Sequence, residues 1–254
     1  MNKFQHTIGR EITIEGVGLH SGRDIVMTLK PAGENDGISF TRVDVVPGVT
    51  IPVAPDRVND TRMATTINEG PVFVSTIEHL MSAFSGLGVD NVKVCVNAPE
   101  TPILDGSGLL YAKAILEAGL VEQNKARSYV RVKKTVEVKD GDKWARLTPA
   151  DSFQMDFAID FHNPAIDKTK QRVQVDFAQE NYLDAVAYAR TFGFLSDLNK
   201  LRAMGLAQGG TLQNAVVVDG DTIVNPEGLR ADDEFVKHKM LDAMGDLYVL
   251  GQPL

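Results

Sequence analysis

The feature that most constrains the fold is the order in which two hydrophobic periods appear along the chain. Apolar residues recur at every second position in Ile25, Met27 and Leu29 and again in residues 92–96, which is typical of half-buried strands. Helical spacing appears in residues 76–86 and 108–118. Each half of the chain groups strands and helices instead of alternating them one by one. The pattern therefore favours an α+β fold over a doubly wound parallel sheet.

A polar stretch at residues 122–128 interrupts the apolar pattern and divides the chain. Strand patterns begin again after it, with a hairpin turn at Asp140-Gly141. We expect three helices in the second half, at 180–189, 195–204 and 232–250. The sequence therefore predicts a first domain over residues 1–126 and a second domain over residues 127–254.

Composition excludes several classes of protein. The 254 residues carry a formal charge of −8, which argues against general binding to nucleic acid or to anionic membranes. A single cysteine, Cys95, excludes an internal disulfide and a cysteine-rich zinc site, so a metal would need histidine and carboxylate ligands. The N-terminus shows no apolar signal region, and no apolar run approaches the ~20 residues that span a bilayer. We expect a soluble cytosolic protein.

The helix expected at 232–250 carries the most informative pair of side chains. His238 and Asp242 are four residues apart, so they are neighbours on one face of a helix and can share one Zn²⁺. The alternative is an ordinary ion pair on a solvated face. An apolar stripe lies roughly opposite this pair and can face the core: Val236, Met240, Ala243, Leu247 and Leu250.

Glu78-His79 forms a second candidate, on the helix expected at 76–86, for which Gly86 is the expected C-cap. His79 would complete a set of two histidines and one aspartate that leaves a coordination position open, as catalytic zinc sites do. Glu78 would then suit a general base. The alternative is structural, because Ser75 to Glu78 also fits a capping box and His79 also fits an ordinary half-buried histidine.

Other candidate site residues lie elsewhere in the sequence. Thr191, in the stretch 190–194, offers a hydroxyl to a developing oxyanion, or the stretch is only a helix-terminal turn with core aromatics. Lys143 and Lys239 are either anion contacts or solvated lysines. Gly209-Gly210, close to Leu206 and Ala207, either leaves room for a ligand chain or forms a loop.

Several stretches in order along the chain resemble one family, the zinc-dependent UDP-3-O-acyl-N-acetylglucosamine deacetylases of lipid A biosynthesis. The resemblance extends over almost the whole chain, and its motifs are long and specific. The stretches are GVGLHSG at 16–22, VSTIEHLMSAFSGLGVDN at 74–91, NAPETPILDGS at 97–107, DGDKWA at 140–145, DFHNPAID at 160–167, ARTFGF at 189–194 and DEFVKHKMLDAMGDL at 233–247.

The resemblance implies two α+β sandwich domains with the active site between them, in a cytoplasmic monomer. It implies a zinc ion, or Fe²⁺, which the same ligands accept, held by His79, His238 and Asp242. Glu78 would be the general base and Thr191 would help hold the oxyanion. The implied contacts with the nucleotide and sugar are Lys143, Phe161, Phe192, Asp197 and Lys239. The implied walls of an acyl passage within 193–218 are Leu198, Ala207, Gly210 and Val217.

One part of the family pattern has no match in the sequence. The family places a general-acid histidine on a Lys-Ser-Gly-His type segment, oriented by the residue that corresponds to Asp246, and the printed sequence stops before it, at Leu254. His20 is the only local substitute. If these 254 residues are the whole protein, we expect an incomplete second domain and a loss of turnover of about 10²- to 10⁴-fold. If they are a fragment, full activity belongs to the longer product. The alternative function is a weakly active or non-catalytic form that binds zinc and the nucleotide lipid.

Overall fold

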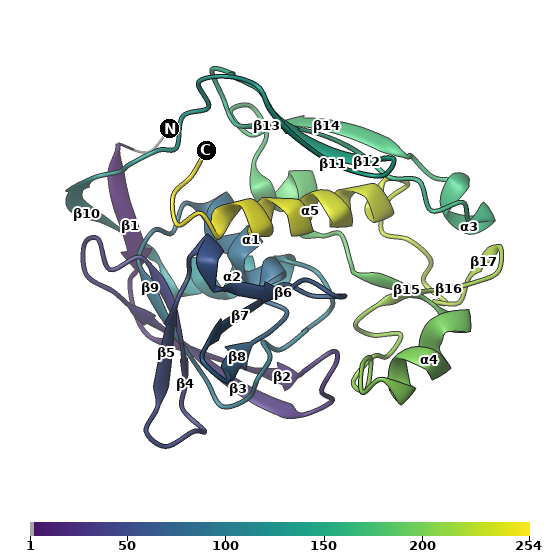
Figure 1. The fold of residues 1–254 in the computed structure, drawn as a ribbon, viewed down its shortest axis with the longest axis horizontal. Helices are drawn as coiled ribbons and strands as arrows, with labels where there is room; N and C mark the ends of the chain where they lie inside the picture. The colour runs from purple at the N-terminus through teal and green to yellow at the C-terminus, as the bar shows by residue number, and fades with distance from the viewer. Residues whose placement is uncertain (1–2) are drawn as a thin grey trace.

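The computed structural model describes residues 3–254, and a single long helix, α5, lies between its two halves (Figure 1). The first half is built around a five-stranded sheet with the strand order β2-β3-β9-β4-β5, antiparallel except for the parallel pair β4 and β9. These strands are β2 (Ile12–Val17), β3 (Asp24–Pro31), β4 (Ile38–Arg42), β5 (Val49–Pro52) and β9 (Val92–Val96). The two-residue period predicted in β3 and β9 is confirmed, because Met27, Val94 and Val96 are fully buried.

Two smaller sheets and two helices complete the first half. A three-stranded antiparallel sheet has the order β6-β7-β8, and β1 pairs with β10. Their bounds are β6 (Val58–Asp60), β7 (Thr66–Glu69), β8 (Val72–Val74), β1 (Phe4–Ile8) and β10 (Leu120–Ala126). The helices are α1 (Glu78–Leu87) and α2 (Leu109–Ala118), and a short 3₁₀ turn, η1, covers Pro55–Arg57.

The second half is divided into three small sheets. The hairpins β11–β12 and β13–β14 are separate two-stranded sheets, and β15-β16-β17 forms a third. The strands are β11 (Val136–Asp140), β12 (Lys143–Leu147), β13 (Gln154–Ala158), β14 (Arg172–Asp176), β15 (Phe192–Phe194), β16 (Val216–Asp219) and β17 (Thr222–Ile223). The helical elements are α3 (Pro164–Asp167), a π-helical turn η2 (Leu183–Ala187), a 3₁₀ turn η3 (Leu195–Asp197), α4 (Leu198–Ala203) and α5 (Glu234–Tyr248).

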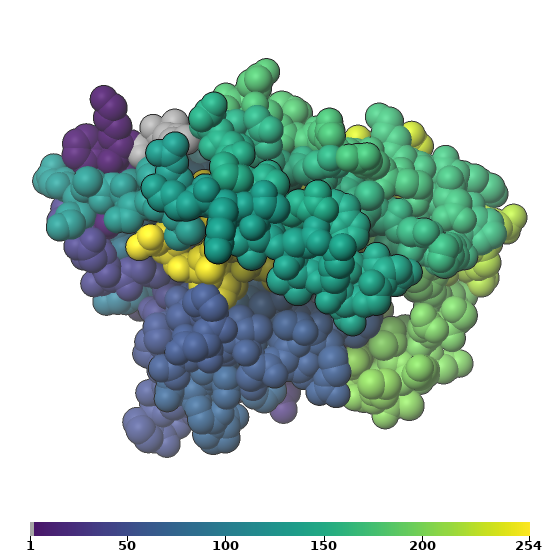
Figure 2. Space-filling model, turned by 45° about the horizontal axis from the view of Figure 1, so that its top comes forward, coloured from purple at the N-terminus to yellow at the C-terminus, as the bar shows by residue number. Residues whose placement is uncertain are grey.

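Helix α5 joins the two halves because apolar side chains surround it. One core cluster contains Phe84 of α1, Met155 of β13, Val175 of β14 and Met240 of α5. In the space-filling view, the teal and green second half lies over the blue first half, and α5 is visible between them in yellow (Figure 2). A smaller core cluster, which includes Phe235, lies under β16 at the start of α5.

The predicted α+β class is confirmed, and the structure corrects three local predictions. Helix α1 ends at Leu87, and its C-cap is Gly88, which has φ +74°, and not Gly86. Gly86 has a different role, because a Cβ there would overlap the ring of Tyr182. The helix expected at 180–189 is only the turn η2. The helix expected at 232–250 is shorter by two residues at each end, and Leu250, predicted to face the core, is exposed. Among residues 3–254, no helix is both long and apolar enough to cross a membrane.

Candidate metal centre

Helix α1 begins at Glu78 without the capping box that the sequence allowed. Its N-cap residue, Ile77, makes no side-chain hydrogen bond, and the Ser75 amide donates to the Pro99 carbonyl oxygen. Thr76 takes a left-handed conformation with φ +57°, and its hydroxyl donates to the buried carboxylate of Glu100 at 3.0 Å. The strained entry places Glu78 and His79 in the first turn of a buried helix.

Helix α5 brings the other two side chains to the same place. His238 is 1% exposed, so its face is not a solvated one, although it lies opposite the buried Val236 and Met240. The helix is buried on both sides because it packs directly on α1. A Cβ at Gly245 would overlap the Glu78 carbonyl oxygen, so only glycine allows this approach.

His79, His238 and Asp242 meet where the two helices cross. The Asp242 Oδ1 atom lies 3.3 Å from His79 Nε2 and 3.4 Å from His238 Nε2. The two imidazole rings are nearly perpendicular, with centroids 5.0 Å apart. One ligand atom from each of the three residues lies within 4.8 Å of the other two. The contact that the sequence could not establish, between two helices 150 residues apart, therefore exists.

The electrostatics of the three side chains suit a cation. Burial lowers the pKa of His238 to about 3, so its imidazole is neutral. Burial opposes the charge on Asp242, but the positive charges of Lys239 and His79 outweigh it and hold the pKa of this carboxyl below its usual range. Burial also opposes the charge on His79, and Asp242 outweighs it and raises the pKa of this histidine. Metal ligands must be deprotonated, and His238 and Asp242 already are.

Hydrogen bonding also indicates a missing partner at this point. Asp242 Oδ1 is buried and has no hydrogen-bond partner among residues 3–254, whereas Oδ2 accepts from Lys239 Nζ at 2.9 Å. Donor atoms around a tetrahedral zinc, with bonds of 2.0–2.2 Å, lie about 3.3–3.6 Å apart. The distances from Asp242 Oδ1 to the two Nε2 atoms match this spacing, so the three residues fit a zinc ion.

Glu78 lies beside this group in a separate hydrogen-bonded arrangement. Its side chain is 7% exposed, and Oε2 accepts from the Thr65 amide at 3.0 Å. Burial raises the pKa of the Glu78 carboxyl to about 7. The Thr65 hydroxyl donates to Asp246 Oδ1 at 2.6 Å, which ties the exposed Asp246 at the edge of the site to the same segment.

Aromatic side chains from the second half lie against one side of the three candidate metal ligands. The Phe192 ring lies 6.1 Å from the His238 ring and 5.2 Å from the Phe161 ring. Lys239 Nζ lies 5.4 Å from the centre of the Phe192 ring. Thr191, half-buried, is held by its backbone: its amide donates to the Gly106 carbonyl oxygen at 2.7 Å, and its own carbonyl accepts from Val216. The structure thus places Phe192 beside His238 and Lys239 beside Asp242, with Phe161 against Phe192.

Other predicted contacts are more exposed. Lys143 lies on the exposed hairpin β11–β12, and Asp197 lies in the exposed turn η3. The segment predicted to form a passage is partly buried at each of its four predicted walls: Leu198, Ala207, Gly210 and Val217. This segment docks on the first half, because the Ala207 amide donates to His20 Nδ1 at 3.4 Å. His20 therefore faces the passage segment.

Two parts of the site were missed by sequence reasoning. Thr65 bridges Glu78 and Asp246, and no local pattern in the chain marks it. The Ala189 carbonyl oxygen accepts from His238 Nδ1 at 3.0 Å, and a backbone acceptor leaves no trace in side-chain spacing. Both are tertiary contacts between segments far apart in the chain.

The chain matches one family model across nearly its whole length. The model is described as UDP-3-O-acyl N-acetylglycosamine deacetylase, and it matches residues 5–254. The match includes both helices that supply the candidate metal ligands and the segments around them. On this evidence the chain belongs to the UDP-3-O-acyl N-acetylglycosamine deacetylase family.

Proposed function

We propose that this protein hydrolyses the N-acetyl group of UDP-3-O-acyl-N-acetylglucosamine with a bound zinc ion and releases acetate. The family acts as a deacetylase in lipid A biosynthesis. The observation that carries the proposal is the convergence of His79, His238 and Asp242, with an unpartnered Asp242 Oδ1 between the two Nε2 atoms.

These three residues would hold the metal through one atom each. Zinc, when bound, supplies a Lewis acid that lowers the pKa of a water toward ~7 and polarises the acetamide carbonyl. The chain's own contribution is to keep these ligands dry and fixed, since His79 and His238 are no more than 3% exposed. Lys239 neutralises the second oxygen of Asp242 and fixes its rotamer.

Glu78 acts as the general base that takes a proton from the attacking water. A base is most effective when its pKa lies near the working pH, and burial raises the pKa of this carboxyl to about 7. The Thr65 amide holds Oε2, which leaves Oε1 for the proton. We assign a positioning role to Asp246: it orients the group that donates a proton to the leaving amine.

Thr191 donates its hydroxyl to the oxyanion that develops on the carbonyl oxygen. A donor fixed before the reaction costs no reorganisation when charge appears, and the Thr191 backbone is fixed on both sides by hydrogen bonds. The amine must be protonated as the C–N bond breaks, because an amide anion is too basic to leave. The products are acetate and a nucleotide lipid that carries a free glucosamine amine.

The remaining residues bind the substrate. Phe161, Phe192 and Asp197 border the sugar and nucleotide, and Lys143 and Lys239 contact the phosphates. The acyl chain lies along the segment 193–218, against its four predicted walls, Leu198, Ala207, Gly210 and Val217.

The test is to measure acetate release and zinc content in parallel on the 254-residue chain. We expect stoichiometric zinc, loss of activity with a chelator and recovery when Zn²⁺ is added back. Fe²⁺ in place of zinc would identify a different physiological metal with the same ligands.

Two outcomes contradict the proposal in different ways. Stoichiometric zinc without acetate release would mean that the protein binds zinc and the nucleotide lipid but does not hydrolyse the acetyl group. If the wild type contains no metal, and if replacing His79 or His238 by Ala does not change the metal content, then these residues do not form a metal site.

A further inference from the structure

A backbone oxygen sets the tautomer of His238 and helps to orient its ring. Its Nδ1 lies 3.0 Å from the Ala189 carbonyl oxygen, which can only accept, so Nδ1 carries the proton. In a neutral imidazole the lone pair is then on Nε2, the atom that points toward Asp242. A shift of the Ala189 carbonyl would release both the ring orientation and the tautomer.

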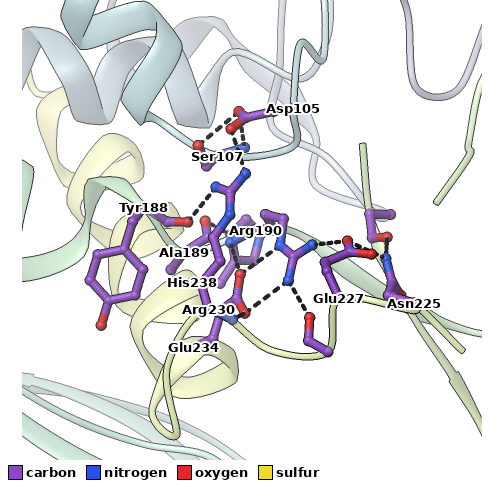
Figure 3. A network of polar contacts seen from close by, with 12 residues as sticks. Asp105, Ser107, Tyr188, Ala189, Arg190, Asn225, Glu227, Arg230, Glu234 and His238 are labelled. Atoms are coloured by element: carbon purple, nitrogen blue, oxygen red, sulfur yellow. Dashed lines mark hydrogen bonds and ion pairs between the residues drawn. The ribbon is translucent and has the colours of Figure 1, made fainter. Parts of the chain in front are cut away.

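The residue after Ala189 is held by a buried ion pair (Figure 3). Arg190 is 3% exposed and Glu234 is 0% exposed. Glu234 Oε1 accepts from Arg190 Nε at 2.8 Å and from the Arg190 amide at 3.1 Å. The guanidinium also donates to Glu227 and to the Gly228 carbonyl oxygen. Arg190 is thus fixed through both its backbone and its side chain.

Glu234 and His238 lie one turn apart on the same face of α5. Glu234 binds Arg190, and His238 binds the carbonyl of the preceding residue, Ala189. The helix therefore holds two consecutive residues of one segment at two points. Any movement of Arg190 relative to α5 changes the hydrogen bond that orients the metal-binding ring.

The residue before Ala189 is held as well. Arg230 donates to the Tyr188 carbonyl oxygen at 2.8 Å and to Asp105 Oδ2 at 2.9 Å, and its amide donates to Glu234 Oε2 at 2.6 Å. Asp105 belongs to the first half of the chain, so Arg230 connects the segment to both halves. Figure 3 shows these contacts on either side of Ala189.

We propose that Arg190 and Glu234 are positioning residues for the metal: their buried pair fixes the Ala189 carbonyl, which holds His238 in the tautomer that presents Nε2. Arg230 supports the same carbonyl from the other side. The inference rests on the proposed metal site and adds the residues that prepare it. Loss of a partner that orients a metal-bound histidine lowers the metal affinity by about 10- to 100-fold.

The central experiment compares the wild type with Arg190→Lys. Lysine keeps the buried positive charge but cannot serve both oxygens of Glu234 and the Gly228 carbonyl together. Zinc affinity is measured by competition with a chelator, and the His238 tautomer is measured by ¹⁵N NMR of the imidazole nitrogens in metal-free protein. We expect the zinc Kd to rise by about 10- to 100-fold and the NMR spectrum to show both tautomers.

Arg127→Lys is the matched control. Arg127 also forms a buried ion pair, with Asp90 at 2.7 Å, and it also contacts α5, through the Tyr248 hydroxyl at 3.3 Å. This pair lies at the opposite end of α5 from Glu234. We expect a similar loss of stability in urea, with zinc Kd and the His238 tautomer unchanged. Equal effects of the two variants on zinc affinity would show a general stability effect and overturn the inference.

A milder variant covers the case in which Arg190→Lys does not fold. The Arg230 side chain is 34% exposed, and Arg230→Ala leaves the buried pair in place. We expect a smaller rise in zinc Kd and a detectable second tautomer. Unchanged affinity and a single tautomer in both folded variants would refute the inference while leaving the proposed function intact. A wild type that binds no zinc would refute the proposed function instead.

Discussion

His79 and His238, proposed as metal ligands, lie in very different surroundings from Lys143 and Asp197, proposed to bind the substrate. His79 and His238 are 3% and 1% exposed, and both are on helices that pack against each other. Lys143 and Asp197 are exposed, on a separate hairpin and in a short 3₁₀ turn. The two histidines lie between α1 and α5, next to the larger core cluster. Lys143 and Asp197 lie on small elements of the second half.

The difference follows from what each group must do. Charges in a metal site act most strongly where water is excluded, and their geometry must be set before the substrate arrives. Recognition residues instead bury their surface when the substrate covers them, so they need to be reached from solvent. We expect substitutions in the first group to change the chemistry or the packing, and substitutions in the second group to change binding only.

The largest effect is expected for Glu78→Gln. Glutamine keeps the shape and can still accept from the Thr65 amide, but it cannot take a proton from water. We expect turnover to fall by about 10²- to 10⁴-fold with zinc content unchanged, measured by acetate release and metal analysis. Glu69→Gln, at an exposed position, should change neither. Loss of zinc in Glu78→Gln would mean that Glu78 is a ligand.

Asp242→Ala should have the next largest effect, on the metal itself. The change removes the atom that lies between both histidine Nε2 atoms, so we expect zinc affinity to fall by more than the roughly 10- to 100-fold typical of outer partners. Chelator competition measures it. His162→Ala removes a histidine whose side chain is 84% exposed and serves as the control. Full zinc binding by Asp242→Ala would show that Asp242 is not a zinc ligand.

A pair of glycine substitutions tests the packing difference directly. Gly245→Ala places a Cβ on the Glu78 carbonyl oxygen, and we expect a loss of about 1–3 kcal/mol in the free energy of unfolding. Gly193→Ala, in β15, meets no atom within 4 Å and should stay within about 0.5 kcal/mol. Urea denaturation of both variants measures the difference. Equal stabilities would mean that the two regions are packed alike.

The smallest effect is expected for Lys143→Ala. An exposed charge contact contributes about 0.2–1 kcal/mol, so KM should rise by up to about fivefold, less at high salt, with kcat unchanged. Lys139→Ala is the matched control, because Lys139 lies on the opposite face of the same hairpin. A fall in kcat for Lys143→Ala would place this lysine in the chemistry and not in recognition.

Local patterns were sufficient where an element's own residues decide its structure. The period of β3 and β9, the helix α2 and the hairpin turn at Asp140-Gly141 were all predicted from the sequence. Local patterns gave a wrong prediction where contact with another segment decides the structure. Gly86 was expected to end α1, but Tyr182 packs on it and the helix continues to Leu87.

The sequence was enough to indicate the α+β class and the residue types that can hold a zinc ion, and its resemblance to one family pointed to three candidate ligands. The spacing of His238 and Asp242 is a property of one helix and needs no other contact. That His79 meets this pair, that Thr65 holds Glu78 and that Ala189 contacts His238 became visible in the folded chain. These contacts join segments far apart in the chain, and their geometry depends on how buried surfaces pack, which local periodicity does not encode.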